Sequence, residues 1–114
     1  MTVPYDLKAL FEEAFKKTPH IKLRMKGKSM YPILKDGETH TVAKKAIEEI
    51  KEGDIVVYQK LYSQQCRCYA HLVLKRIGRE SLYFVVGDSK GKPLNEIVFP
   101  EEVIGVVVLG GDSR

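Results

Sequence analysis

The chain has 114 residues, of which 44% are apolar and 30% charged, and its net charge is +4. This length suits one domain with a modest core, and the basic residues are too scattered to indicate a nucleic-acid-binding protein. No run is long and apolar enough for a signal peptide or a membrane span. We therefore expect a soluble, cytoplasmic protein.

The N-terminal residues 4–17 are predicted to form an α-helix. Apolar side chains recur there at helical spacing, and Pro19 ends the pattern. We expect Leu10 and Phe11 to be buried, either against a sheet or against a partner chain. The same apolar stripe could support a homodimer or the binding of a partner protein.

From residue 21 onward the chain alternates strand-like runs with turns. β-branched and aromatic residues fill the runs, and Gly, Asp and Asn mark the turns. The predicted strands are residues 21–25, 39–43, 55–58, 66–77, 81–86, 95–99 and 103–109, with a polar loop at 63–65 and a tight hairpin turn at 78–80. We predict a mostly β fold: a single domain over residues 1–114, with an antiparallel sheet over 21–108 and the helix packed on it.

A corner with a serine follows the first of these strands. Gly27 lets the backbone turn sharply, and Pro32 restricts the direction in which it leaves. The hydroxyl of Ser29 would then be aimed by the backbone, as a serine nucleophile requires. The alternative is an ordinary turn in which Ser29 only favours the turn conformation.

A serine nucleophile also needs a base, and the 66–77 strand offers two. His71, Val73 and Lys75 are expected to share one face of this strand. Histidine titrates near neutral pH, whereas lysine loses its proton there only when it is desolvated. Asp88, in the loop after the hairpin, could return beside His71 and orient its ring. Each of these residues could also have a purely structural role.

The two cysteines do not predict a metal site. Cys66 and Cys68 lie two residues apart on one strand, and reduced thiols are the ordinary state in a cytosolic protein. His71 would have the opposite parity to both cysteines on that strand, and no fourth ligand is apparent. We therefore predict neither a metal nor a cofactor.

A series of segments in order resembles the signal peptidase and LexA-type serine peptidase superfamily. The segments are 27–34 (GKSMYPIL), 36–38 (DGE), 53–57 (GDIVV), the strand that carries His71 and Lys75, 87–89 (GDS) and 103–107 (VIGVV). The resemblance runs from about residue 21 to residue 108. It implies a coiled antiparallel β-sheet domain and acyl transfer through a serine.

The resemblance implies a role for several residues of the 27–32 corner. Ser29 takes the position of the nucleophile, and its backbone N–H is expected to contribute to the oxyanion hole. Gly27, Met30 and Pro32 take positions in the oxyanion and substrate-binding region. Gly27 offers no hydroxyl where some signal peptidases carry a serine.

Two alignments compete for the base. His71-Leu72-Val73 resembles the His-Arg-Val of archaeal, sporulation-type and endoplasmic-reticulum signal peptidases, although Leu72 replaces the arginine. Lys75-Arg76-Ile77 resembles the Lys-Arg-Ile/Val of bacterial signal peptidases and LexA-type repressors. The spacing to Asp88 favours His71, and the resemblance then makes Asp88 its acid.

The expected function is that of a small serine endopeptidase with a Ser–His or Ser–Lys arrangement. It would act on a peptide or protein substrate. The chain has no DNA-binding domain, and it lacks the Ala-Gly or Cys-Gly bond that LexA-type proteins cleave in themselves. The alternative is a peptide-binding module of the same fold with incomplete catalytic machinery.

Overall fold

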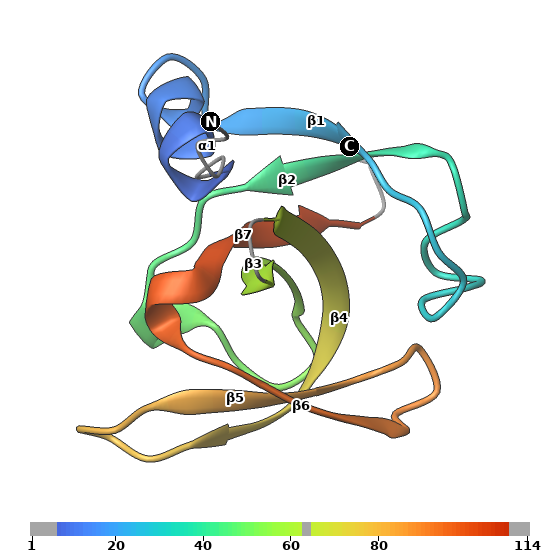
Figure 1. Cartoon of the computed structure of the whole chain (residues 1–114), viewed down its shortest axis with the longest axis vertical. Coiled ribbons are helices and arrows are strands. Elements are labelled where there is room, and N and C mark those ends of the chain that lie inside the picture. The colour runs from blue at the N-terminus through green and yellow to red at the C-terminus, as the bar shows by residue number, and fades with distance from the viewer. Residues whose placement is uncertain (1–6, 63–64, 110–114) are drawn as a thin grey trace.

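The computed structural model describes residues 7–62 and 65–109 of the chain. These residues form one α-helix, two short 3₁₀ helices and seven strands (Figure 1). In chain order they are α1 (Leu7–Phe15), β1 (His20–Arg24), β2 (Thr39–Ala43), η1 (Ile47–Glu49), β3 (Ile55–Tyr62), β4 (Gln65–Ile77), β5 (Tyr83–Gly87), β6 (Pro93–Val98), η2 (Pro100–Glu102) and β7 (Val103–Val108).

The seven strands form one antiparallel sheet in the order β1-β2-β7-β3-β4-β5-β6. β4 curves through the molecule and connects its two halves: β1, β2 and β7 lie at the top, and the β5–β6 hairpin lies at the bottom (Figure 1). The prediction of a mostly β, antiparallel fold with a helix packed on the sheet is confirmed. The signal peptidase or LexA type of this fold stays a prediction.

Apolar side chains are buried on both faces of the sheet, because residues alternate between the faces along each strand. The hairpin-side core consists of Ile50, Val56, Tyr58, Val73, Phe84, Val86, Val98, Val103 and Val106. The helix-side core consists of Met30, Leu34, Val42, Ile55, Val57, Ile104 and Val107, with Phe11 and Phe15 of α1 packed against it. The second cluster anchors the turn that carries Ser29, since Met30 and Leu34 belong to it.

The helix is shorter than predicted and is only partly buried. α1 ends at Phe15, where the N–H groups of Lys17 and Thr18 both donate to the carbonyl of Ala14. Phe11 packs on the sheet, but Leu10 is 54% exposed, so its predicted burial against the sheet is wrong. The sheet covers only one side of this nine-residue helix, and Leu10 does not lie on that side. Residues 4–6 of the predicted helix lie outside the described residues.

The predicted strands all occur, and some are longer than predicted. β3 continues past residue 58 to Tyr62, because residues 59–62 pair with 65–68 of β4. Of the predicted 63–65 loop, residue 65 begins β4 and the other two lie outside the described residues. β6 begins at Pro93 rather than at residue 95.

A β-bulge in β4 changes which residues share a face. Val73 pairs with Val86 and Lys75 pairs with Val85, so Leu74 is an extra residue in the ladder. Directly opposed residues point to the same face, so Lys75 lies on the opposite face from Val73. The predicted common face of His71, Val73 and Lys75 is therefore wrong for Lys75.

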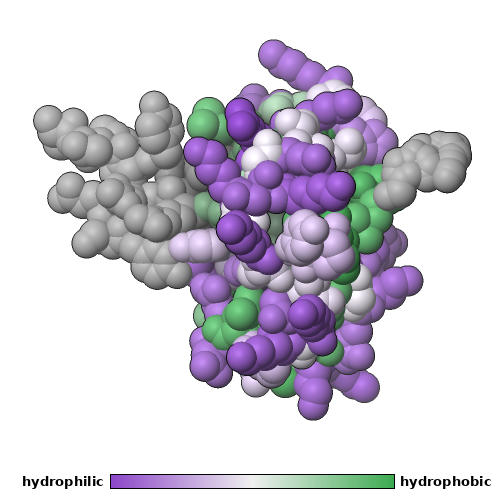
Figure 2. Space-filling view, turned by 90° about the vertical axis from the view of Figure 1, so that its right-hand side faces the viewer, coloured by the Kyte–Doolittle hydropathy of each residue, from purple (hydrophilic) through white to green (hydrophobic). Residues whose placement is uncertain are grey.

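Two loops project from the same side of the molecule, on the right in Figure 1. They are residues 25–38, between β1 and β2, and residues 88–92, between β5 and β6. Seen from this side the surface is mainly hydrophilic, with small apolar areas between the polar groups (Figure 2). Within the described ranges, no helix has the length and apolar character that crossing a membrane requires.

Candidate active site

The turn after β1 holds Ser29 at the surface between buried anchors. Gly27 has φ +112°, a conformation that side chains disfavour, and its N–H donates to the Asp36 carboxylate at 2.9 Å. Met30 and Leu34 are buried, and the Leu34 N–H donates to the Met30 carbonyl at 2.8 Å. Ser29 lies directly before these anchors and is exposed. The anchored backbone of the turn thus holds the Ser29 hydroxyl at the surface.

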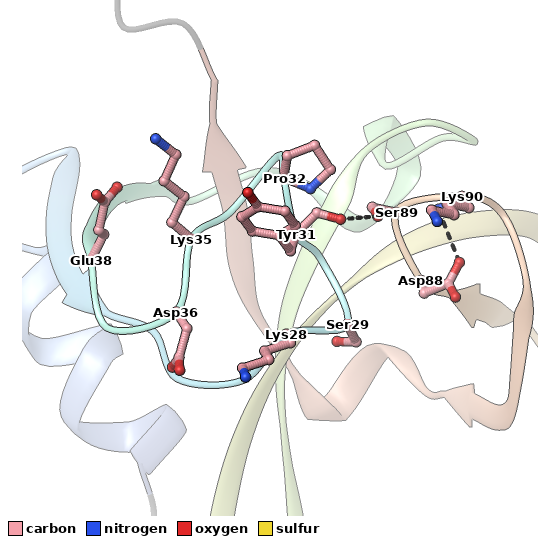
Figure 3. A pocket seen from close by; sticks show the side chains of 10 residues that line it. All are labelled: Lys28, Ser29, Tyr31, Pro32, Lys35, Asp36, Glu38, Asp88, Ser89 and Lys90. Carbon is pink, nitrogen blue, oxygen red and sulfur yellow. Dashed lines mark hydrogen bonds between the residues drawn. The ribbon is translucent and has the colours of Figure 1, made fainter.

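The loop between β5 and β6 holds the same turn from the other side. The Ser89 N–H donates to the Ser29 carbonyl at 3.0 Å, and the Ser89 hydroxyl donates to the Tyr31 carbonyl at 2.6 Å (Figure 3). These bonds tie the position of Ser29 to the end of a hairpin some sixty residues away in the chain. Ser89 was not among the predicted site residues, although it belongs to the 87–89 segment.

Asp88 stabilises its own loop rather than the histidine. Its carboxylate accepts hydrogen bonds from the N–H groups of Lys90 and Lys92, both at 2.9 Å. Hydrogen bonding from Lys92, and then from Lys90, lowers the pKa of Asp88 despite some opposing desolvation. The expected pairing with the His71 ring does not occur among the described hydrogen bonds. Both main-chain bonds end on Oδ1, and neither carboxylate oxygen has a described hydrogen bond to His71.

His71 is the candidate base that the fold brings to Ser29. Its Nε2 lies 3.1 Å from Ser29 Oγ, within hydrogen-bond distance. Lys75 is exposed on the other face of β4, and no hydrogen bond joins it to Ser29 in the described part of the chain. The bulge at Leu74 is the reason, because it reverses the direction of the side chains that follow.

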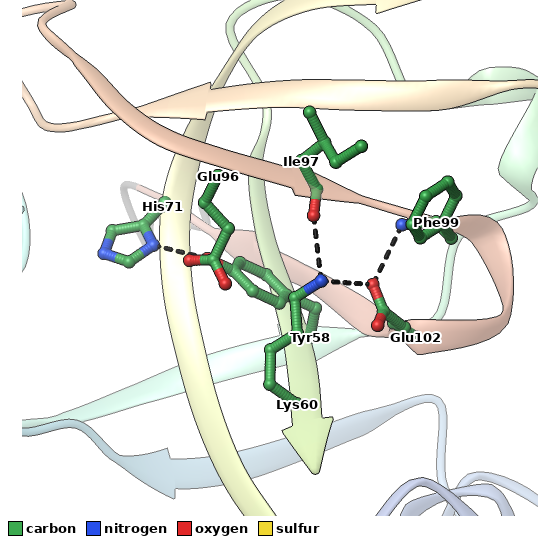
Figure 4. Close-up of polar contacts among 7 residues, drawn as sticks. All are labelled: Tyr58, Lys60, His71, Glu96, Ile97, Phe99 and Glu102. Atoms are coloured by element: carbon green, nitrogen blue, oxygen red, sulfur yellow. Dashed lines mark hydrogen bonds and ion pairs between the residues drawn. The ribbon is translucent and has the colours of Figure 1, made fainter. Parts of the chain in front are cut away.

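The opposite nitrogen of the His71 ring is bound by a tyrosine. The Tyr58 hydroxyl lies 2.7 Å from His71 Nδ1 and donates to the Glu96 carboxylate at 2.9 Å (Figure 4). The ring of Tyr69 stacks on His71 with a centroid distance of 6.0 Å. Three strands, β3, β4 and β6, therefore contribute to the surroundings of one imidazole.

Burial lowers the pKa of the His71 ring. Desolvation lowers the pKa of His71 below its ordinary value of 6.5, and the negative charges of Glu96 and Asp88 oppose part of this shift. The imidazole is therefore neutral at neutral pH. A neutral imidazole next to a hydroxyl can accept its proton.

Ser29 lies where two clefts meet. The β1–β4 cleft, of about 540 Å³, is lined by residues 23–30, Leu34 and residues 68–71. The loop cleft, of about 820 Å³, lies on the other side of Ser29 and takes its walls from the 28–38 and 88–90 segments (Figure 3). An extended peptide that occupied both clefts would pass next to the Ser29 hydroxyl.

The other predicted binding residues also surround these clefts. Gly27 and Met30 line the β1–β4 cleft, Met30 from the buried side, and Pro32 lines the loop cleft after a cis Tyr31–Pro32 bond. No acceptor takes the Ser29 N–H within residues 7–62 and 65–109. This N–H is a donor on the same residue as the hydroxyl, where the predicted oxyanion hole needs one.

The described residues contain no group of three or more His, Cys, Asp or Glu side chains that could hold a metal ion. The side chain of Cys66 lies outside the described part, so the trio with Cys68 and His71 is not described in full. The site as described is built from a hydroxyl, an imidazole, a phenol and carboxylates.

Sequence reasoning missed Tyr58 and Glu96. A weak signal for Glu96 was present, since it has the parity of Val98, which is fully buried on the same strand. A carboxylate on the buried face of a strand needs a hydrogen-bond or ion-pair partner. Tyr58 ends a run of apolar residues, where a buried hydroxyl likewise needs a partner.

No family model, curated protein or solved structure matches the chain. Its function is therefore inferred from the site itself.

Proposed function

We propose that this chain is a serine endopeptidase of the signal peptidase and LexA-like type, with Ser29 as nucleophile and His71 as general base. The observation that carries the proposal is the 3.1 Å contact between Ser29 Oγ and His71 Nε2 at the junction of two clefts. A serine hydroxyl becomes a competent nucleophile when a base within hydrogen-bond reach can take its proton. The lowered pKa of His71 supports this role, because the ring is then unprotonated at neutral pH.

The substrate is a peptide bound as an extended strand in the β1–β4 cleft. β1 lies at the edge of the sheet, and β4 pairs with β5 only from Leu72 onward. The Met25 N–H bonds to Glu38, so by alternation the main chain of Arg24 points away from β2. By the same alternation, the main chain of Ala70 points away from β3. Both walls of the cleft can thus pair with a peptide main chain, as in β-strand addition.

The floor of this cleft favours apolar side chains. It is formed by Leu23, Met25, Met30, Leu34 and Ala70. Alternate side chains of a bound strand would point toward it. We therefore expect a preference for small or apolar residues before the scissile bond.

The reaction follows from the placement of the groups. Ser29 Oγ bonds to the carbonyl carbon of the substrate while its proton passes to His71 Nε2, and the Ser29 N–H donates to the developing oxyanion. When the C–N bond breaks, Nε2 returns the proton to the leaving amine. A water molecule, deprotonated in turn by Nε2, hydrolyses the ester and restores the Ser29 hydroxyl.

The test uses a serine-reactive probe and a peptide library. The wild type is expected to be labelled at Ser29 and to cleave members with apolar residues before the scissile bond. Ser29→Ala should abolish both, and His71→Ala should lower both by at least ~10²-fold. Lys75→Ala is the matched control, since Lys75 lies exposed on the opposite face of β4, and it should leave both unchanged.

Two outcomes would contradict the proposal. Cleavage that survives Ser29→Ala would exclude Ser29 as the nucleophile. Peptide binding without labelling or cleavage would instead favour the second candidate function, a binding module that uses the same cleft. That candidate is favoured by the open strand edges of the cleft, which can pair with a peptide main chain whether or not Ser29 reacts.

A further inference from the structure

The two nitrogens of the His71 ring have different partners. Nε2 lies 3.1 Å from Ser29 Oγ, and Nδ1 lies 2.7 Å from the Tyr58 hydroxyl. The Tyr58 hydroxyl in turn donates to Glu96 Oε1 at 2.9 Å. The four groups form one chain of hydrogen bonds, which runs from a carboxylate to the serine.

The directions of these bonds determine where the protons lie. A carboxylate only accepts, so the single proton of the Tyr58 hydroxyl is given to Glu96. The Tyr58 oxygen is then an acceptor toward the ring, and His71 Nδ1 must carry the ring proton. In a neutral imidazole this leaves Nε2 unprotonated, facing Ser29.

We propose that Tyr58 and Glu96 are positioning residues that hold His71 in its Nδ1–H tautomer, so that Nε2 can accept the Ser29 proton. This inference rests on the proposed function for its catalytic meaning. Tyr58 and Glu96 thus take the role of orienting the ring, which the sequence had indicated for Asp88.

The surrounding packing holds both groups in place. Tyr58 is fully buried in the hairpin-side core, so its hydroxyl has little freedom to move. Glu96 follows Asn95, which has φ +56° at an irregular point of the β5–β6 ladder. Just beyond it, Lys60 donates to the Ile97 carbonyl at 2.9 Å and pairs with Glu102 at 2.8 Å (Figure 4). This polar cluster ties β6 to β3 next to Glu96.

The other groups around the ring do not perform this task. Asp88 acts on His71 through its charge, but its carboxylate is bonded to the main chain of its own loop. Tyr69 stacks on the ring from the same strand and makes no described hydrogen bond to either nitrogen. The charged groups that influence His71 are thus Glu96 and Asp88, and of the two only Glu96 is linked to the ring through described hydrogen bonds, by way of the Tyr58 hydroxyl.

The direct test is nitrogen-15 NMR of the His71 ring in the wild type, at a pH where the ring is neutral. The expected result is the Nδ1–H tautomer. Tyr58→Phe should increase the Nε2–H form, because Nδ1 loses its acceptor. Glu96→Ala should do the same, because Tyr58 can then turn its proton toward Nδ1. Tyr69→Phe is the control, since it removes a hydroxyl from the ring stacked on His71, and it should leave the tautomer unchanged.

Kinetics provide the second measurement. Tyr58→Phe should lower kcat by ~10²-fold or more with little change in KM. Tyr83→Phe is the matched control, since it removes a hydroxyl from a ring that packs beside Phe99 outside both clefts, and it should change neither. A wild-type ring in the Nε2–H form would overturn the inference, and so would a Tyr58→Phe variant with unchanged tautomer and kcat. The NMR result does not depend on cleavage. An Nδ1–H ring in a chain that cleaves nothing would therefore count against the proposed peptidase, and not against the hydrogen-bond chain.

Discussion

At the scale of single residues, the site depends on the environment of one imidazole. His71 is partly buried, and it touches a hydroxyl on each side, Ser29 at Nε2 and Tyr58 at Nδ1. Desolvation favours the neutral ring and outweighs the nearby carboxylates. The result is a base that remains unprotonated below the pH at which an ordinary histidine titrates.

This environment predicts the pH dependence of activity. Because the pKa of His71 is below 6.5 in the folded chain, kcat/KM should fall on the acid side with an inflection below that value. Stability should change in the same direction. The unfolded chain binds this proton more readily, so the free energy of unfolding falls as pH drops from about 6.5 through the folded pKa.

A pH–rate profile and urea unfolding at several pH values measure these two effects. His71→Gln serves as the control, because it should remove this contribution to the pH dependence of stability. An inflection well above pH 7 would indicate a different base.

At the scale of elements, the bulge in β4 decides which side chains reach the site. It brings Leu74 close to Gly87, where a Cβ atom would lie 2.6 Å from Leu74 Cδ1 and 2.6 Å from the Lys92 carbonyl oxygen. Gly87 also ends β5, directly before the loop that holds Ser29 through Ser89. The absence of a side chain at Gly87 is thus required by packing.

Gly87→Ala should therefore destabilise the fold by about 1–3 kcal/mol, as overpacking does. Chemical denaturation measures this change. In the double variant Leu74→Ala/Gly87→Ala the two costs should not add, because truncation of Leu74 removes one of the two clashes. A Gly87→Ala protein as stable as the wild type would show that the bulge is not tightly packed.

The short helix gives a second prediction at this scale. Phe11 packs against the helix-side core, whereas Leu10 is 54% exposed. Phe11→Ala should cost about 1–3 kcal/mol because it removes partly buried apolar surface. Leu10→Ala should cost less than about 1 kcal/mol and provides the matched comparison. Equal costs for the two variants would mean that both faces of the helix are covered, for example by a second chain.

At the scale of the whole molecule, the site is assembled from distant parts of the chain. Ser29 comes from the β1–β2 connection, His71 from β4, Tyr58 from β3 and Glu96 from β6. The β5–β6 loop then fastens the serine turn through Ser89, whose hydroxyl donates to the Tyr31 carbonyl at 2.6 Å. The position of the Ser29 side chain thus depends on contacts between segments that are far apart in the chain.

Ser89→Ala tests this dependence. It should lower the free energy of unfolding by about 0.5–1.5 kcal/mol and reduce kcat more than it changes KM, because the turn loses one of its fixed points. Ser81→Ala, in the exposed turn between β4 and β5, is the control and should have no effect on activity. If Ser89→Ala leaves both kcat and stability unchanged, the Ser89 hydroxyl does not hold the turn.

The features of this protein that depend on local physics can be predicted from the amino-acid sequence. Apolar and β-branched runs bounded by turn residues predicted all seven strands, and Gly27 with Pro32 predicted the corner that presents Ser29. These features could be found because side-chain period and turn chemistry act within a few residues. The prediction of His71 as a possible base likewise required only its spacing and its ordinary titration range.

Which side chains contact one another depends on the three-dimensional fold. One extra residue, Leu74, turned Lys75 to the other face, and no local pattern signals such a bulge. The Asp88 carboxylate accepts hydrogen bonds from the main chain of its own loop. The His71 ring is instead bonded to Tyr58, which donates to Glu96 on another strand. Register and long-range contacts select one arrangement among several that the same local preferences allow, because a shift of one residue moves a side chain to the opposite face of the sheet.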